Sequence, residues 1–325
     1  MAASDQIKSL IKSFGEDDEE RFFSSAIQIA ASEARLGHVN IAQELKSLIE
    51  QARKNRTHQV FDKHKIVSLS QTKRDLLELI DVFQPQITLK DMVLEQELSN
   101  VLSRVIDEQR KAEILRQHQL SPQRKLLLMG PPGCGKTMTA EAIAGELGIP
   151  IFIVRLDGIM SKFMGESIVK LRSIFDAMPN QRAVYLFDEF DSIGSHRHIG
   201  QDVGEVKRVL NSFLINIEKD QSNSIIIAAT NLPESLDKAL FRRFDEIISY
   251  PLPSKEDIIE ILKKQTRSFK FDKKPQFRQL AEVAEGLNYS DIVKACEETI
   301  KYMILSEEKT ISSVLLNRTL QKKRL

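Results

Sequence analysis

A lysine and a threonine that follow a glycine-rich turn could together bind a phosphate group and a magnesium ion. The segment 124–137 reads RKLLLMGPPGCGKT, in which an apolar run breaks into a turn that ends in Lys136 and Thr137. Glycines at this spacing let successive backbone N–H groups point at a phosphate, and a helix beginning near Lys136 adds the positive end of its dipole. Lys136 is therefore predicted to reach the β- and γ-phosphates of a nucleotide, and Thr137 to ligate Mg²⁺.

The context of this turn favours nucleotide binding over the alternative, a glycine-rich turn with no ligand. An apolar strand precedes it and the amphipathic segment TAEAIAGEL follows it. The residues predicted to hold the nucleotide are Gly130, Pro131, Pro132, Gly133, Cys134, Gly135, Lys136, Thr137, Met138 and Asp188. Cys134 stands at an unrestricted position of the loop, where either its oxidation could block the nucleotide or it is simply a small residue that the loop tolerates.

Two adjacent carboxylates stand at the end of another apolar run. The segment AVYLFDEFD, residues 183–191, has the pattern of a buried strand that places Asp188 and Glu189 at the carboxyl edge of a sheet, beside the phosphates. Asp188 is predicted to hold Mg²⁺, and Glu189 to orient and polarise the attacking water, a task worth about 10²–10⁴ in rate. The alternative is an exposed acidic strand end.

An amide and two arginines are candidates for contact with the γ-phosphate. The apolar run IIIAATN ends at Asn231, which is predicted to hydrogen-bond the γ-phosphate or the lytic water; an ordinary turn is the alternative. Arg242 and Arg243 follow in LDKALFRRFDE. Within one subunit they would be surface charge, whereas in a ring they would face the neighbouring subunit's γ-phosphate, where such arginines are worth about 10³–10⁵ in rate. Activity would then depend on assembly.

The segment SKFMGES, residues 161–167, is predicted to form a loop that lines a central pore. Lys162, Phe163 and Met164 would contact an extended polypeptide there, the aromatic ring gripping it without regard to its sequence. The alternative for Phe163 is a core residue in a turn. The polar segment GSHRHIGQDVG, residues 194–204, is a candidate second pore loop.

These residues need a scaffold that brings several strand ends to one edge, and the rest of the chain supplies its elements. Apolar runs at 151–154, 183–187, 224–229 and 246–250 alternate with helical spacing at 167–177 and 203–217. Strands that alternate with helices indicate an α/β fold with a parallel sheet covered on both faces. Residues 255–305 carry only helical spacing and are expected to form a smaller lid, followed by a short, frayed basic tail at 317–325.

The predicted division of the chain has four parts. Residues 1–56 carry the periodicity of a small N-terminal helical domain of three helices, which either docks a partner or merely packs. Residues 57–90 form a linker and a connecting helix, 91–252 the α/β core, and 253–325 the helical lid with its basic tail. Within the core, the segment DMVL at 91–94 is placed where backbone and apolar side chains would touch adenine.

Composition excludes several classes of protein. Of the 325 residues, 42% are apolar and 29% charged, which is the balance of a folded globular protein rather than a disordered one. The formal net charge of +1 provides no overall field that would draw the chain to nucleic acid or to an anionic membrane. The chain has no run of about 18 apolar residues and no signal-peptide core at its N-terminus, so a cytoplasmic protein is expected. Its two cysteines are too few for a disulfide framework or a zinc site.

Taken together, these motifs resemble those of the AAA family of ATPases over residues 91–305. GPPGCGKT resembles the family's Walker A motif, LFDE its Walker B, SKFMGES its first pore loop, AATN its sensor 1 and ALFRRFDE its arginine-finger segment. The resemblance implies a P-loop NTPase fold with strand order 5-1-4-3-2 and a C-terminal all-helical lid, with ATP and Mg²⁺ as ligands. It also implies a homo-oligomeric ring, usually hexameric, that remodels or threads protein substrates.

Two departures from the family pattern matter. Where many relatives have Ser-Gly-Ala-Asp, this chain has NYSD at 288–291 with no arginine, which puts nucleotide sensing from the lid in doubt and leaves Lys294 as a weak substitute. The finger segment also lacks the Pro-Gly insertion common before Arg-Phe-Asp, so the sequence leaves open which of Arg242 and Arg243 acts in trans.

The arrangement of one ATPase domain after a short helical N-terminus is similar to bacterial ATPases encoded beside subtilisin-like serine proteases, some linked to phage defence. No G-x-S-x-G protease motif occurs here, so any proteolysis would belong to a separate partner. A second hypothesis is a DNA-associated AAA switch, which would need a basic DNA-binding module. A third is a GTPase, because residues 191–194 match D-x-x-G, but no N-K-x-D motif follows.

Overall fold

The chain consists of two units, and each is described by itself. In this computed structural model the described residues are 19–35, 38, 42–43, 45–49, 80–154, 156, 166–191, 203–236 and 238–324. The first unit spans Met1–Lys65 and the second Ile66–Leu325. All described residues of the predicted site belong to the second unit.

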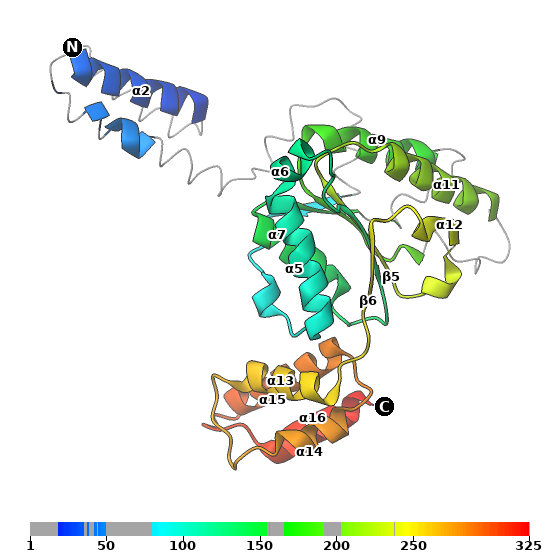
Figure 1. Cartoon of the computed structure of the whole chain (residues 1–325). Helices are drawn as coiled ribbons and strands as arrows, with labels where there is room; N and C mark the ends of the chain where they lie inside the picture. The colour runs from blue at the N-terminus through cyan, green and yellow to red at the C-terminus, as the bar shows by residue number, and fades with distance from the viewer. Residues whose placement is uncertain are drawn as a thin grey trace. The chain divides into compact units, whose positions relative to one another are not determined.

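The first unit contains the helix α2 (Glu19–Arg35), drawn in blue in Figure 1. Ser25 and Ala30 are buried, whereas about half of the Ile27 side chain is exposed, so the helix packs on one side. The three-helix arrangement predicted for residues 1–56 stays a prediction, because the helix expected before Glu19 lies outside the described residues.

A six-stranded sheet forms the centre of the second unit. Five of its strands are parallel, namely β2 (Lys125–Met129), β3 (Ile151–Val154), β4 (Val184–Phe187), β5 (Ile225–Thr230) and β6 (Glu246–Ser249). The order across the sheet is β1-β3-β4-β5-β2-β6. Numbered from the strand that precedes the phosphate loop, the five parallel strands follow the predicted order 5-1-4-3-2. The predicted α/β fold is therefore confirmed.

The sixth strand, β1 (Ile80–Phe83), corrects the sequence prediction, which assigned this region to a linker and a connecting helix. β1 pairs antiparallel with β3, so that Ile80 lies opposite Val154 and Phe83 opposite Ile151. Four residues are too few for their own periodicity to distinguish a strand from a helix. The strand forms because the open edge of β3 offers backbone partners and because Ile80 and Val82 pack against the core.

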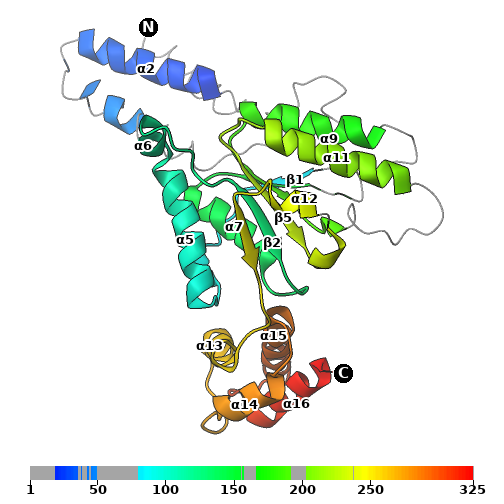
Figure 2. The ribbon, with the colours of Figure 1, turned by 45° about the vertical axis from the view of Figure 1, so that its right-hand side comes forward.

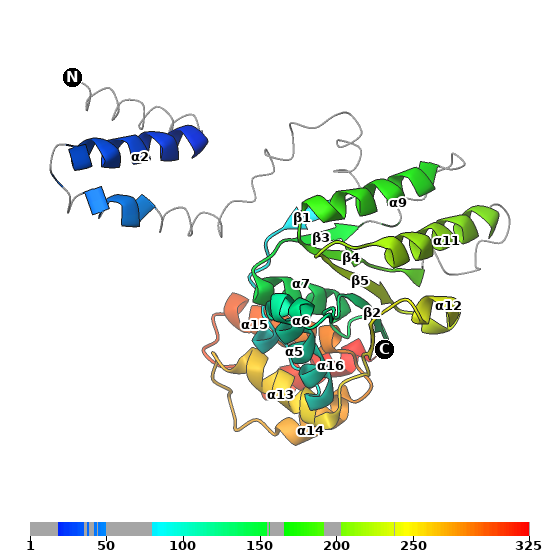
Figure 3. The same cartoon turned by 45° about the horizontal axis from the view of Figure 1, so that its top comes forward.

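Helices cover both faces of the sheet, as Figures 2 and 3 show. The helices α9 (Glu166–Ala177) and α11 (Val203–Lys219) cover one face, and α5 (Gln96–Arg110) and α7 (Lys136–Leu147) cover the other. On the first face Phe175, Phe187 and Phe213 form an aromatic cluster with ring centroids 5.0 to 5.7 Å apart. The central strands β3, β4 and β5 are thus buried on both sides, which explains why they are almost entirely apolar. The short elements are η1 (Leu89–Asp91), α6 (Ala112–Gln117), η2 (Met178–Asn180), η3 (Pro233–Ser235) and α12 (Lys238–Phe241).

Four helices form the lid after the last strand: α13 (Lys255–Thr266), α14 (Phe277–Ala284), α15 (Tyr289–Leu305) and α16 (Ser313–Lys323). Ser254 begins α13 with a reciprocal capping box, its hydroxyl accepting from the Asp257 N–H while the Asp257 carboxylate accepts from the Ser254 N–H. Cys296 is fully buried in the lid core.

The C-terminal segment corrects a second prediction, that residues 317–325 are a frayed tail. Most of this segment belongs to α16, and Leu316 and Leu320 are fully buried against the other lid helices. Two leucines one helical turn apart are a weak signal among basic and polar neighbours, and only the packing partners reveal their role. No helix in the described part of the chain is long and apolar enough to cross a membrane.

Candidate active site

The phosphate loop joins β2 to α7 at the carboxyl edge of the sheet. Gly130, Gly133 and Gly135 have φ values of 147°, 74° and 95°, which residues with a side chain rarely adopt. A Cβ atom on Gly130 would come within 2.2 Å of the Tyr250 carbonyl oxygen, and one on Gly133 within 2.7 Å of Asn288 Oδ1. The turn therefore requires glycine for its backbone angles and for its close neighbours. It has the shape in which backbone N–H groups surround a phosphate.

Lys136 brings the phosphate loop and the end of β5 together. Its Nζ donates to the carbonyl oxygens of Gly130 at 2.7 Å and Pro131 at 2.9 Å, and to Asn231 Oδ1 at 2.8 Å. The side chain is buried, and burial lowers the pKa of Lys136, an effect that Cys134, Asp188 and Asp191 oppose. Two residues predicted separately from distant motifs, Lys136 and Asn231, are therefore in direct contact.

Thr137 and Asp188 also meet. The Thr137 hydroxyl donates to Asp188 Oδ2 at 2.7 Å, joining the first turn of α7 to the end of β4. A hydroxyl and a carboxylate side by side, next to the phosphate loop, are oxygen ligands of the kind that would hold Mg²⁺ in a nucleotide site. The residues present therefore fit the ion that the sequence predicted.

Glu189 has an unusual backbone conformation. Its φ is 49°, in the left-handed region that costs a residue such as glutamate about 1–3 kcal/mol. The conformation is held on both sides, because the Glu189 N–H donates to Asp188 Oδ1 at 2.9 Å and the Phe190 N–H donates to the Ala229 carbonyl at 2.8 Å. The side chain is exposed and borders the cleft. A strained backbone conformation that is maintained by neighbouring hydrogen bonds is typical of functional residues.

These residues line a cleft of about 560 Å³ between the phosphate loop and the lid. The residues that line it are Pro132, Gly133, Gly135, Lys136, Thr137, Met138, Asp188, Glu189, Asn231, Tyr289, Ser290, Val293, Lys294 and Glu297. The structure thus brings together most of the residues predicted to bind nucleotide and the predicted Glu189 and Asn231. Gly130, Pro131 and Cys134 belong to the same loop but do not line the cleft.

Cys134 points into the protein. Its side chain is 3% exposed, the Tyr289 N–H is hydrogen-bonded to it, and burial raises the pKa of the thiol. Because the thiolate is the reactive form, a buried thiol with a raised pKa is a poor target for oxidation. Of the two alternatives for Cys134, the structure favours the small residue that the loop tolerates.

The two predicted arginines lie away from this cleft, and their environments differ. Arg243 Nε lies 2.8 Å from Glu218 Oε1 of α11, so its guanidinium forms an ion pair within the subunit. The Arg242 side chain is exposed. Within the described residues, the cleft of one chain therefore receives neither arginine, and a role for them at a γ-phosphate needs a second subunit.

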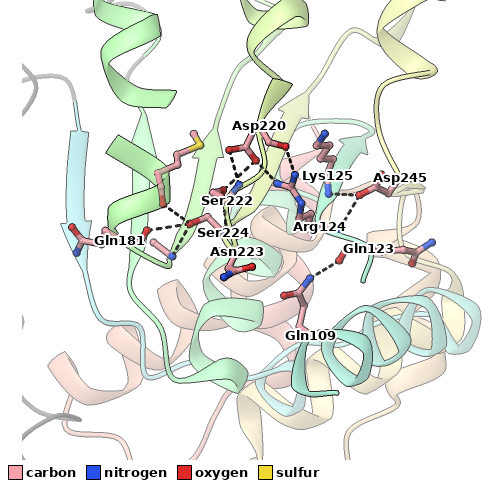
Figure 4. A network of polar contacts seen from close by, with 12 residues as sticks. Gln109, Gln123, Arg124, Lys125, Gln181, Asp220, Ser222, Asn223, Ser224 and Asp245 are labelled. Atoms are coloured by element: carbon pink, nitrogen blue, oxygen red, sulfur yellow. Dashed lines mark hydrogen bonds and ion pairs between the residues drawn. The ribbon is translucent and has the colours of Figure 1, made fainter. Parts of the chain in front are cut away.

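The segment that carries the arginines is attached to the beginning of β2, as Figure 4 shows. Asp245 Oδ2 accepts from the backbone N–H groups of Arg124 and Lys125, each at 2.9 Å. Arg124 also forms an ion pair with Asp220, which directly follows α11 and is nearly buried. The strand β2 therefore links the two regions. The phosphate loop follows its C-terminal end, and the arginine segment is hydrogen-bonded to its N-terminal end through Asp245.

The segment 91–94, predicted to touch adenine, lies between the phosphate loop and the lid. Met92 lies near Gly135 and contacts the Thr139 hydroxyl, while Val93 packs in the lid core. Lys264 of the lid donates to the carbonyl oxygens of Lys90 and Met92, at 2.7 and 3.3 Å. The position is compatible with a base-binding segment, and the adenine contact stays a prediction.

Some residues of the site were missed by sequence reasoning, and others lie outside the described residues. Val293 and Glu297 line the cleft from the lid, and only their helical spacing after 288–291 could have indicated this. In the sequence, Asp191 stands out only as the first residue of the D-x-x-G match at 191–194. The predicted pore residues Lys162, Phe163 and Met164, and most of the second candidate loop at 194–204, lie outside the described residues.

Comparison with known proteins identifies the family. Residues 126–252 match the family described as "ATPase family associated with various cellular activities (AAA)". The chain is 33% identical to the uncharacterized AAA family ATPase y4kL of Sinorhizobium fredii, over 99% of this chain and 95% of that protein.

Two further relatives match over a smaller share of their own length. The chain is 30% identical to the ATP-dependent zinc metalloprotease FtsH 4 of Sphaerobacter thermophilus, over 77% of this chain and 39% of that protein. It is 32% identical to the proteasome-activating nucleotidase of Methanoregula boonei, over 77% of this chain and 58% of that protein. The glycine cradle, the acidic strand end and the parallel sheet agree with these matches, and the chain belongs to the AAA family of ATPases.

Proposed function

We propose that the chain binds ATP in the cleft between the phosphate loop and the lid, hydrolyses it to ADP and phosphate, and as a ring-shaped oligomer uses this reaction to remodel protein substrates. The observation that carries the proposal is the pair of contacts at the carboxyl edge of the sheet. Lys136 contacts Asn231, and Thr137 contacts Asp188. Side chains that follow β2, β4 and β5 thereby lie close together, next to the glycine-rich phosphate loop.

The roles of the binding residues follow from their chemistry. The backbone N–H groups of residues 130–137 and the dipole of α7 would receive the β-phosphate, and the Lys136 ammonium would neutralise the β- and γ-phosphates. Thr137 and Asp188 would hold Mg²⁺, which supplies positive charge to the phosphate oxygens when bound. Lys136 contacts only backbone carbonyls and one amide oxygen among the contacts described above, so no carboxylate competes for its charge at hydrogen-bond distance.

Glu189 and Asn231 would act on the attacking water. Glu189 is exposed at the edge of the cleft, where its carboxylate can accept a proton from a water in line with the γ-phosphate. Asn231 would donate through its amide nitrogen to the γ-phosphate or to the water, because its amide oxygen is already engaged by Lys136. The contact with Lys136 thus fixes which end of the Asn231 amide faces the substrate.

We assign the trans-acting role to Arg242. The Arg243 guanidinium is ion-paired with Glu218 in the same subunit, whereas Arg242 is exposed and extends from the same short turn. In a ring, Arg242 would then complete the neighbouring site, and Arg243 would hold the turn in place.

The remodelling of proteins is supported by the relatives. One is named an ATP-dependent zinc metalloprotease and another a proteasome-activating nucleotidase. We extend to this chain the idea that hydrolysis acts on polypeptides, with Lys162, Phe163 and Met164 as the residues that contact them. A separately encoded subtilisin-like protease as partner stays a prediction, which co-purification from the source organism can test.

The first experiment measures phosphate release by the purified chain with ATP, with and without Mg²⁺, together with oligomer mass by light scattering. Glu189→Gln should bind ATP but hydrolyse it about 10²–10⁴-fold more slowly. Glu297→Gln is the matched control, because Glu297 also lines the cleft but comes from the lid. If Glu189→Gln hydrolyses ATP as fast as Glu297→Gln and the wild-type chain, Glu189 has no role in the reaction.

A second experiment separates hydrolysis from work on a protein. Phe163→Ala should keep the basal ATPase rate but lose the unfolding of a tagged fluorescent test protein, and Phe163→Tyr should keep both. Loss of basal hydrolysis and unfolding in equal measure would refute the pore role.

A further inference from the structure

Asp191 receives two hydrogen bonds from the end of the neighbouring strand. It stands three residues after Asp188, in the turn that follows β4, and its Oδ1 accepts from the Thr230 hydroxyl and from the Asn231 N–H, each at 3.1 Å. Thr230 is fully buried, whereas Asn231 is half-buried at the cleft. The carboxylate therefore joins the ends of β4 and β5 at the point where the cleft begins.

The bonds to Asp191 belong to a longer series that ends at the predicted phosphate-binding lysine. The Asn231 backbone is held by Asp191, and its side-chain oxygen accepts from Lys136 Nζ at 2.8 Å. The Thr230 hydroxyl that donates to Asp191 also accepts from the Leu232 N–H at 3.1 Å. Asn231 is therefore held at both its backbone and its side chain. Its neighbours Thr230 and Leu232 belong to the same set of hydrogen bonds.

A simpler explanation is that Asp191 only caps a turn. Aspartate often accepts backbone N–H groups in turns, with no role beyond stability. Two observations point further. The backbone N–H that Asp191 holds is that of Asn231, a residue that lines the cleft, and the carboxylate is close enough to Lys136 to oppose the effect of burial on its pKa.

We propose that Asp191 is a positioning residue for ATP hydrolysis, which acts by holding the Asn231 backbone so that its side chain meets Lys136 and the γ-phosphate region. The inference rests on the proposed function. Reaction geometry has to be kept within fractions of an ångström, and a displacement of about 1 Å can lower a rate about 10²-fold. Removing the acceptor should therefore reduce the rate of hydrolysis and leave the binding of ADP, which lacks the γ-phosphate, nearly unchanged.

The test uses the full chain and three single variants, two at Asp191 and one at its partner Asn231. Asp191→Ala removes the acceptor, Asp191→Asn keeps an oxygen in place without the charge, and Asn231→Ala removes the positioned group. Single-turnover hydrolysis of ATP and the dissociation constant of a fluorescent ADP analogue are measured for each. We expect Asp191→Ala to hydrolyse about 100-fold more slowly and Asp191→Asn less than about 10-fold more slowly, with ADP affinity within about threefold of wild type for both.

The double variant Asp191→Ala/Asn231→Ala gives the decisive comparison. If Asp191 acts through Asn231, adding Asp191→Ala to Asn231→Ala should slow hydrolysis by less than about threefold, because the two losses are not independent. Independent, multiplicative losses would overturn the inference, as would a normal rate in Asp191→Ala or equal damage to ADP binding and hydrolysis. If the wild-type chain does not hydrolyse ATP at all, the proposed function fails instead, so the two failures are distinguishable.

Discussion

Lys136 Nζ donates a hydrogen bond of 2.8 Å to Asn231 Oδ1, although 95 residues separate them in the sequence. The contact joins the first residue of α7 to the residue that follows β5. It is possible because β2 and β5 are adjacent parallel strands whose carboxyl ends meet at one edge. Separation of these two strands would therefore break the contact between Lys136 and Asn231.

Nucleotide binding should weaken at alkaline pH through Lys136. Burial lowers the pKa of Lys136 below the ordinary 10.5 of lysine, so the folded chain loses this proton at a lower pH than the unfolded chain. Above that pKa the affinity for ATP should fall by about tenfold per pH unit, while the cost of the buried charge disappears and the fold itself gains stability. Titration of ATP binding against pH checks this. Lys136→Arg, whose charge does not titrate, should bind ATP with no such decline; the same decline in that variant would assign it to another group.

The strained backbone of Glu189 should be visible in stability. Glu189→Gly can adopt a φ of 49° without strain, whereas Glu189→Ala keeps the strain and loses the same carboxylate. Both variants should fail to hydrolyse ATP, but the glycine variant should be more stable than the alanine variant by about 1 kcal/mol, or about 2–4 °C in melting temperature. Differential scanning calorimetry measures the difference. A glycine variant that melts below the alanine variant would show that the left-handed conformation is not strained.

The assignment of Arg242 predicts complementation between two inactive chains. Arg242→Ala should reduce ATPase activity by about 10³-fold or more and leave ADP binding intact. Mixed with Glu189→Gln chains, it should recover part of the activity, because the Glu189→Gln neighbour supplies Arg242 to an intact cleft. Mixing Arg242→Ala with Arg242→Ala/Glu189→Gln chains is the control, and should restore nothing. Absence of recovery in the first mixture, with mixed oligomers present by native mass spectrometry, would contradict the trans role.

The buried ion pair between Arg124 and Asp220 should matter for folding. The Asp220 side chain is 4% exposed and the Arg124 side chain 16%, so Asp220→Asn leaves a buried guanidinium without its countercharge. We expect a loss of about 3–5 kcal/mol in the free energy of unfolding. The surface pair between Arg116 and Glu113 provides the control, since Glu113→Gln should change stability by less than about 1 kcal/mol. Urea denaturation followed by circular dichroism compares the two, and similar losses would mean that burial is not the deciding factor.

The sequence predicted those parts of the site whose residue types are dictated by local chemistry. A phosphate turn needs glycines and a lysine in one short segment, and the strand that ends in Asp188 and Glu189 is apolar because both its faces are buried. The lid side was harder to predict. Tyr289 and Glu297 reach the cleft only because the Ser290 N–H donates to the Gly133 carbonyl at 3.0 Å, which sets α15 against the phosphate loop.

Contacts between distant segments explain the remaining misses. The Tyr250 hydroxyl donates to Thr139 Oγ1 at 2.7 Å, across 111 residues, and the Thr139 hydroxyl in turn donates to the Gly135 carbonyl of the phosphate loop. Nothing near Tyr250 in the sequence indicates that partner. The same holds for Asp191, whose role depends on the end of a strand 40 residues later in the chain.

The antiparallel strand β1 has a practical consequence for anyone who prepares shorter fragments. A fragment that starts at residue 91, the predicted domain boundary, or at 126, where the family match begins, would lack it. Its removal would leave the outer backbone groups of β3 without hydrogen-bonding partners, and the unpaired edge of a sheet tends to pair with other chains. Self-association of such a fragment would then arise from its truncation and would be mistaken for natural assembly unless a fragment that retains β1 is compared with it.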